Sequence, residues 1–153
     1  MAATSGTDTS DFPTEGVGIT IQFVVGNLER SRAYYRDVLG ATETGEPGGA
    51  AVVLAFQGTT LVLVTGSSAT PERPDVTFRP PADIGHVSLR LTIQVPDCRQ
   101  AYEVLTARGA AFLAPPVEYE EEVRAFFRDP DGHLLEISEP TREAVPGPAV
   151  RGE

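Results

Sequence analysis

The sequence contains no lysine and no tryptophan, and it has only one cysteine, one methionine and two histidines among its 153 residues. All twelve basic residues are arginines, and 22 acidic residues bring the formal net charge to −10. An acidic chain without a basic cluster is poorly suited to binding nucleic acid or an anionic membrane. No apolar run approaches the roughly 20 residues of a membrane-spanning helix. We therefore expect neither a nucleic acid nor a membrane as a partner.

The single cysteine limits the covalent chemistry of the chain. Cys98 has no second cysteine with which to form an internal disulfide, which is typical of a reducing compartment, so we expect a cytoplasmic protein. Residues 1–16 lack both a positively charged start and an apolar stretch, and a signal peptide is not expected there. Because Cys98 begins a predicted helix, we interpret it as a small buried apolar residue.

The most informative stretch is a predicted hairpin over residues 124–140. Two apolar runs flank Asp129-Pro130-Asp131-Gly132, in which proline fixes φ near the start of the turn and glycine accepts a positive φ near its end. Neighbouring residues of a strand point to opposite faces. Glu136 therefore lies on the face opposite Leu135 and Ile137, toward whatever the other side of the sheet encloses. His133, beside the turn, is expected to face solvent.

Hydrophobic periodicity and capping signals divide the rest of the chain into two similar halves. The predicted strands are 19–25, 50–56, 60–65, 86–95 and 111–113, the predicted helices are 28–39 and 98–108, and 66–85 is a long loop. Residues 1–15 are expected to be a disordered tail and 141–153 a flexible one.

The two halves share a repeated pattern of capping residue, helix and glycine. Asn27 and Asp97 are 70 residues apart, and Gly40 and Gly109 are 69 apart. Such a period indicates duplication of one unit. We therefore predict an α+β fold of two βαβββ modules, residues 17–66 and 84–140 of one domain spanning 16–140. Their curved sheets would enclose a cleft.

Two segments resemble a known family, the vicinal oxygen chelate superfamily, which includes glyoxalase I, extradiol dioxygenases and bleomycin resistance proteins. They are Ile19–Gly40 (ITIQFVVGNLERSRAYYRDVLG) and Phe126–Pro140 (FFRDPDGHLLEISEP). The resemblance implies paired βαβββ modules around a small-molecule cleft. Many members are dimers, so a homodimer is expected.

The resemblance also implies positions for a divalent metal ion. Carried onto this chain, the four ligand positions fall on Glu136, Thr20, Arg90 and Val62. Only Glu136 is a strong ligand, since Val62 has no donor atom and Arg90 is a fixed cation. A cofactor is therefore not favoured. If zinc, nickel, iron or manganese binds, Glu136 and His86 are its candidate ligands, although His86 lies roughly 13 Å along the predicted strand from Arg90.

Several side chains are candidates for contact with a ligand. Arg90 would anchor a carboxylate or phosphate, or instead form a structural pair with Glu136. Glu136 is either a catalytic acid or base, or a buried carboxylate paired with Arg90 or Arg124. The remaining ligand-binding candidates are Thr20, Gln22, Arg124 and Phe126; a solvated strand face or core packing would explain the same residues.

Three functions remain open from the sequence. The first is a metal-free protein that binds a drug-like or aromatic metabolite and either sequesters it or acts on it. The second is a metal-dependent lyase, isomerase or dioxygenase that uses Glu136. The third is an accessory domain whose cleft is filled by its own side chains.

Overall fold

A computed structural model describes residues 12–141 of the chain. The first module contains one four-stranded sheet in the order β1-β4-β3-β2, in which β1 runs parallel to β4 and the other pairs are antiparallel. Its elements are β1 (Thr20–Val25), α1 (Leu28–Asp37), β2 (Thr42–Gly45), the 3₁₀ helix η1 (Pro47–Gly49), β3 (Ala51–Phe56) and β4 (Thr59–Thr65).

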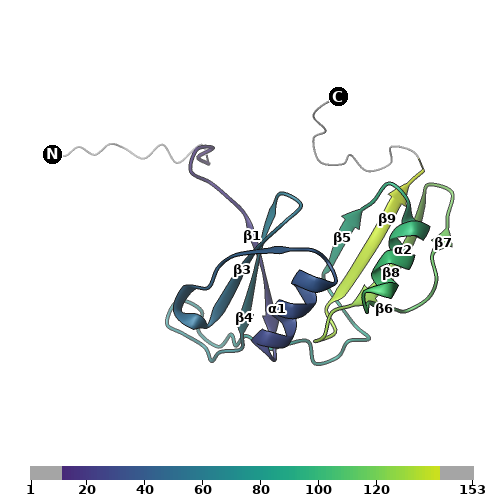
Figure 1. Cartoon of the computed structure of the whole chain (residues 1–153). Coiled ribbons are helices and arrows are strands. Elements are labelled where there is room, and N and C mark those ends of the chain that lie inside the picture. Colours follow the sequence, from purple (N-terminus) through teal and green to yellow (C-terminus); the bar gives the residue numbers. More distant parts are fainter. Residues whose placement is uncertain (1–11, 142–153) are drawn as a thin grey trace.

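The second module repeats this topology. Its sheet has the order β5-β9-β8-β6, with β5 parallel to β9 and a short β7 also paired to β8. The elements are β5 (Arg90–Gln94), α2 (Cys98–Ala107), β6 (Ala111–Phe112), β7 (Val117–Glu118), β8 (Glu122–Arg128) and β9 (Leu134–Pro140). The predicted α+β fold of two βαβββ modules is confirmed, and Figure 1 shows them side by side.

Both helices begin where the repeated pattern predicts, and they end two residues (α1) and one residue (α2) before the predicted bounds. The side chains of Asn27 and Asp97 accept hydrogen bonds, each 3.0 Å long, from the backbone N–H three residues later. This satisfies a donor that the first turn of a helix leaves unpaired. Gly40 and Gly109 follow the helix ends with φ of 81° and 112°, in the left-handed region that favours glycine.

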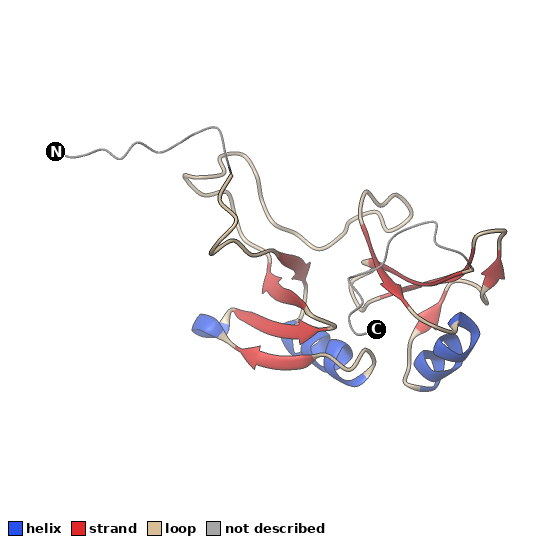
Figure 2. Ribbon diagram, turned by 90° about the horizontal axis from the view of Figure 1, so that it is seen from above, coloured by secondary structure: helices blue, strands red, loops and turns tan. Residues whose placement is uncertain are grey.

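Each helix covers one face of its own sheet, and both lie on the same side of the molecule (Figure 2). The covered faces form the hydrophobic core. Alternation along each strand decides which side chains enter it. The largest fully buried apolar side chains are Tyr35, Phe127, Leu54, Leu61, Leu63, Leu135 and Ile137.

The hairpin between β8 and β9 joins the two modules by docking on α1. Asp131 accepts hydrogen bonds from the backbone N–H of Gly26 and from Nη2 of Arg30, both at 2.9 Å. The hydroxyl of Tyr35 donates to Asp129 over 2.7 Å. These contacts link residues about a hundred positions apart, so the turn that ends one module also anchors the other.

Three features differ from the prediction. β5 begins at Arg90 instead of residue 86, because its partner β9 begins at Leu134, directly opposite Arg90, and the chain before Leu134 turns away. β2 and β7 were not predicted, since each is short and mostly polar. The predicted tails lie outside the described residues, apart from 12–15 and 141.

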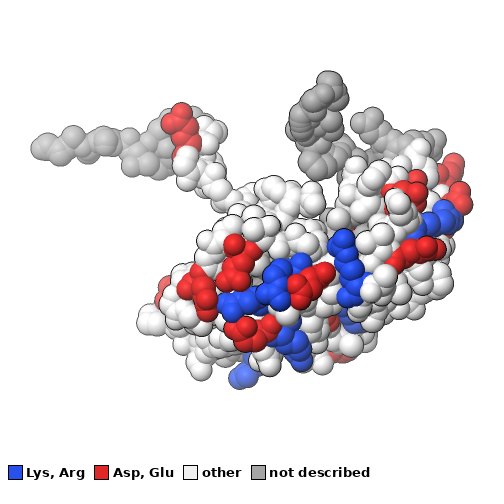
Figure 3. Space-filling model, in the orientation of Figure 1, with Lys and Arg blue, Asp and Glu red and all other residues white. Residues whose placement is uncertain are grey.

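Positive and negative side chains alternate on the face shown in Figure 3, where arginines lie next to acidic residues. Arg32, for example, forms ion pairs with Glu29, Glu43 and Glu46 at 2.7 to 3.3 Å. The arginines on this face therefore do not form an uninterrupted basic patch. The helices α1 and α2 have ten residues each, and none in the described part of the chain is long and apolar enough to cross a membrane.

Candidate functional site

The second sheet has one face, opposite α2, that is polar. In β8 the buried Val123, Ala125 and Phe127 face the helix side, and their neighbours take the opposite face. The opposite face is built by side chains from three adjacent strands, namely Arg90, Thr92, Glu122, Arg124, Phe126, Glu136 and Ser138. We call this surface the polar face.

Glu136 lies at the centre of the polar face and is the most buried of its charged groups, with 2% of its side chain exposed. Its Oε1 accepts hydrogen bonds from Nε of Arg90 at 2.8 Å and from the hydroxyl of Thr92 at 2.7 Å. β5 lies beside β9 with Thr92 directly opposite Glu136, which sets this arrangement. A buried carboxylate requires such partners, because burial without them is costly.

Arg90 and Glu136 are thus brought together, as one of the predicted alternatives requires. Arg124 pairs elsewhere: its Nη1 lies 3.2 Å from Glu122, which also accepts a hydrogen bond from Ser138 at 2.7 Å. The ring of Phe126 lies between the two arginines, 5.9 Å from the guanidinium carbon of Arg90 and 5.5 Å from that of Arg124. Both distances are within reach of a cation–π interaction.

The candidates on the first sheet lie apart from this cluster. Gln22 stands opposite Val62 in the register of β1 and β4, just as Thr92 stands opposite Glu136 in the second sheet. Val62 is therefore the counterpart of Glu136. Within residues 12–141, Thr20 and Gln22 make no hydrogen bond to Glu136, so the structure does not bring these two predicted side chains to the polar face.

These residues do not fit a divalent metal ion at Glu136. One carboxylate oxygen is already taken by Arg90 and Thr92, and the counterpart position holds the apolar Val62. A transition ion needs several N, O or S donors around it, and a guanidinium next to Glu136 repels it. His86 precedes β5, is exposed, and hydrogen-bonds over 2.9 Å to an aspartate three residues earlier.

A different group of three donors lies in the hairpin turn, where the sequence indicated turn residues only. Ligand atoms of Asp129, Asp131 and His133 lie within 4.8 Å of one another. The aspartate oxygens already accept hydrogen bonds, including those from Tyr35 to Asp129 and from Gly26 to Asp131.

The prediction that His133 faces solvent is wrong: its ring is mostly buried against Phe23, with the ring centroids 4.9 Å apart.

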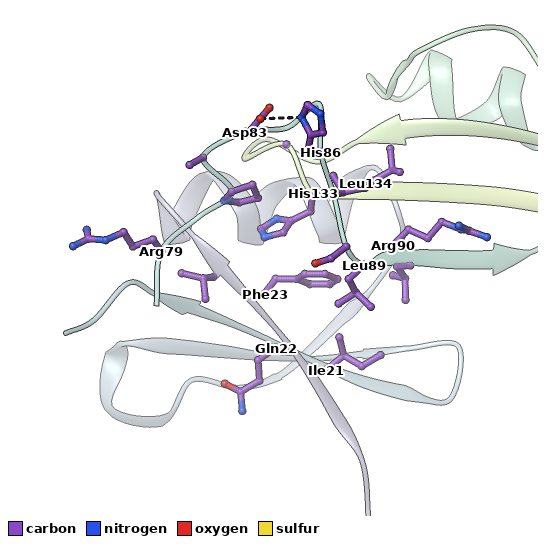
Figure 4. Close-up of a pocket in the computed structure, with 17 residues that line it drawn as sticks. Ile21, Gln22, Phe23, Arg79, Asp83, His86, Leu89, Arg90, His133 and Leu134 are labelled. Atoms are coloured by element: carbon purple, nitrogen blue, oxygen red, sulfur yellow. Dashed lines mark hydrogen bonds and ion pairs between the residues drawn. The ribbon is translucent and has the colours of Figure 1, made fainter. Parts of the chain in front are cut away.

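A cavity of about 500 Å³ lies between the modules. It is bounded by β1, the segment 79–91 and the hairpin residues 132–134. Of the predicted site residues, Gln22, His86 and Arg90 line it, but Figure 4 shows the side chains of Gln22 and Arg90 leading away from its centre. The centre is occupied by Phe23 and His133. In the sequence, the spacing of the aspartates and His133 in the turn is the signal that could have pointed to this cavity.

Residues 19–137 match the family model described as Glyoxalase/Bleomycin resistance protein/Dioxygenase superfamily. A comparison with curated proteins finds no match.

Solved structures with the same fold include proteins of different described roles. A glyoxalase/bleomycin resistance protein/dioxygenase from Nocardioides is 22% identical, with 91% of this chain and 93% of that chain covered and a TM-score of 0.69. TnmS3, an antibiotic binding protein from Streptomyces sp. CB03234, is 24% identical over 85% of this chain and 100% of that chain, with a TM-score of 0.62. A lactoylglutathione lyase from Agrobacterium tumefaciens is 18% identical over 84% and 96%, with a TM-score of 0.61. At these identities, the likeness concerns the fold.

Proposed function

Because the chain belongs to the Glyoxalase/Bleomycin resistance protein/Dioxygenase superfamily, we propose that it binds a small drug-like or aromatic metabolite on the polar face, without a metal ion. The observation that carries this proposal is the 2.8 Å hydrogen bond from Nε of Arg90 to Glu136. The family resemblance implies a metal ligand at the position of Arg90, and in this proposal the fixed positive charge of Arg90 neutralises Glu136 in place of the ion.

Arg90 is suited to bind an anionic group of the ligand. Only its Nε is used by Glu136, and within residues 12–141 its two terminal nitrogens make no hydrogen bond. The side chain is 52% exposed, so these nitrogens are accessible. A guanidinium held in this way can donate two parallel hydrogen bonds to a carboxylate or phosphate.

The surroundings of Arg90 favour an aromatic ligand. Phe126 lies under Arg90 and Arg124 and is only partly buried, so part of its ring remains available for stacking. An aromatic carboxylate would place its ring near Phe126 and its charge near Arg90. TnmS3, which shares the fold, is described as an antibiotic binding protein, and this description is consistent with small-molecule binding here.

The proposal is tested by comparing the ligand affinity of Arg90→Ala with that of Arg99→Ala. Arg99 is an exposed arginine of the same module, 3.5 Å from Glu118, and serves as the matched control. Calorimetric titration with 1-naphthoate and 1-naphthyl phosphate should show binding to the wild-type protein and to Arg99→Ala. Binding to Arg90→Ala should be weaker by at least about tenfold, the value of one lost charged hydrogen bond. Equal binding to all three proteins would contradict the proposal.

We also propose that the protein is a homodimer. Ile19 and Leu89 are 82% and 70% exposed, an unusual state for large apolar side chains at equivalent positions of a repeat. Each directly precedes an edge strand, β1 or β5, whose outer side has no partner strand among the described residues. Sedimentation equilibrium should give twice the monomer mass, and Ile19→Asp with Leu89→Asp should give the monomer. A monomeric wild-type protein would refute this assignment.

A reducing compartment such as the cytoplasm is the proposed location. Cys98 is a buried free thiol, which is compatible with a reducing environment. Fractionation of the source cells with an antibody against the protein tests the location, and recovery outside the cytoplasm would contradict it.

A further inference from the structure

The cavity between the modules has the size and the walls of a small-molecule site. Its volume of about 500 Å³ lies within the range of about 300 to 1,000 Å³ that is usual for ligand pockets. Apolar side chains from both modules contribute to the lining, among them Phe23, Leu89 and Leu134. The loop that covers it packs closely on the hairpin, since a Cβ on Gly132 would overlap Ile84.

His133 is one of several polar residues that line this cavity, and Figure 4 shows its ring near the centre. Its Nδ1 lies 2.8 Å from Oδ2 of Asp129, and the ring packs on Phe23. Asp129 is buried and also accepts hydrogen bonds from the hydroxyl of Tyr35 and from the backbone N–H groups of residues 131 and 133. The imidazole is thus held in one orientation by a carboxylate that is itself fixed.

The carboxylate also determines which ring nitrogen of His133 carries a hydrogen toward it. Burial alone raises the pKa of Asp129, but the hydrogen bonds from His133 and Tyr35 outweigh it and hold this pKa below its ordinary value. Asp129 is therefore ionised and accepts from Nδ1–H, so Nε2 is the ring nitrogen of His133 that remains available to a ligand. Within residues 12–141, Nε2 has no hydrogen-bonding partner.

We propose that this cavity is a second binding site, for a neutral and largely apolar molecule that carries a phenolic hydroxyl, and that Nε2 of His133 accepts the hydrogen bond from that hydroxyl. A phenol fits better than an anion, because Asp129 lies directly behind the ring and the nearby arginines Arg79 and Arg90 point away from the centre.

This site does not depend on the function proposed for the polar face. Glu136, Arg124 and Phe126 are absent from the residues that line the cavity. The guanidinium of Arg90 leads away from it. Loss of aromatic carboxylate binding in Arg90→Ala and loss of phenol binding at His133 are therefore separate results.

The test compares 2-naphthol with 2-methoxynaphthalene, which has nearly the same shape but no hydroxyl hydrogen. The chain has only two histidines, so each imidazole can be assigned in a long-range ¹H–¹⁵N spectrum of the full-length protein. In the wild-type protein, 2-naphthol should shift the Nε2 signal of His133 and bind at least about tenfold more tightly than the methyl ether.

Two variants complete the experiment. Glu103→Gln is the control, because Glu103 is exposed on α2 and does not line the cavity, and it should retain the preference for the naphthol. His133→Asn should bind both compounds alike. Should His133→Asn fail to fold, the wild-type comparison of the two compounds still decides the question. Equal affinity of the wild-type protein for both compounds, or a 2-naphthol titration that leaves the His133 signals unmoved, would overturn the proposal.

Discussion

Tyr35 donates a hydrogen bond of 2.7 Å to Asp129, and this contact joins the helix of the first module to the hairpin of the second. Both side chains are buried, and 94 residues separate them in the sequence. The same carboxylate orients His133, and its neighbour Asp131 accepts from Gly26 and Arg30. One turn therefore holds the two modules together and shapes the cavity between them.

Tyr35→Phe should destabilise the protein by about 1 to 3 kcal/mol, because it removes one donor from a buried carboxylate and leaves the ring in place. Tyr34→Phe is the matched control, since the Tyr34 hydroxyl donates to a backbone carbonyl at 3.2 Å in a partly buried position. Urea unfolding measures both. A Tyr35→Phe protein that is no less stable than Tyr34→Phe would show that the contact does not hold the modules together.

Stability should fall in acid because of Asp129. Its pKa lies below the ordinary value of 3.8 in the folded protein, so the unfolded chain binds a proton more readily. The resulting stabilisation is present above the ordinary pKa and is lost as the pH falls through the folded value. Unfolding free energies measured from neutral pH down to about pH 3 should decline less in Asp129→Asn than in the wild-type protein. Parallel declines in the two proteins would argue against this role.

Cys98 should be unreactive in the folded protein. Burial raises the pKa of its thiol to about 11, with a further contribution from the carboxylate of Glu139. At pH 8 few molecules carry the reactive thiolate, and the sulfur is enclosed. Alkylation with iodoacetamide, followed by mass spectrometry, should be slow in the folded state and fast in urea. Rapid alkylation of the folded protein would contradict this expectation.

The repeat could be predicted from sequence because its signals are local. Asn27, Asp97, Gly40 and Gly109 each act within one helix turn, so spacing alone marked the two modules. The pairing of Arg90 with Glu136 could also be predicted, since both residues fall on one face of adjacent strands.

The contacts between the modules could not be predicted in the same way. His133 was expected in solvent because it follows a turn, but the docking of that turn on α1 buries it against Phe23. Similarly, the start of β5 depends on where β9 begins, and nothing in residues 86–89 signals it. Features set by partners distant in sequence require the folded structure.

Arg90→Ala should weaken ligand binding more than it destabilises the fold. More than half of the Arg90 side chain is exposed, so water can take the place of the guanidinium, and Glu136 keeps its hydrogen bond from Thr92. The loss of stability should therefore stay below the roughly 3 to 5 kcal/mol that breaking a fully buried ion pair costs. Thermal unfolding and the naphthoate titration on the same preparation measure both effects. A large drop in melting temperature with unchanged binding would assign Arg90 a purely structural role.

The central claim is that the guanidinium of Arg90 neutralises Glu136 and takes the place that a metal ion would otherwise occupy. The most direct measurement is a crystal structure of protein grown with excess zinc, with diffraction data collected at the zinc absorption edge. We predict Nε of Arg90 in hydrogen-bonding distance of Glu136, as in the 2.8 Å contact described above, and no anomalous peak at that carboxylate. A zinc ion bound to Glu136, with Arg90 displaced from it, would contradict the account.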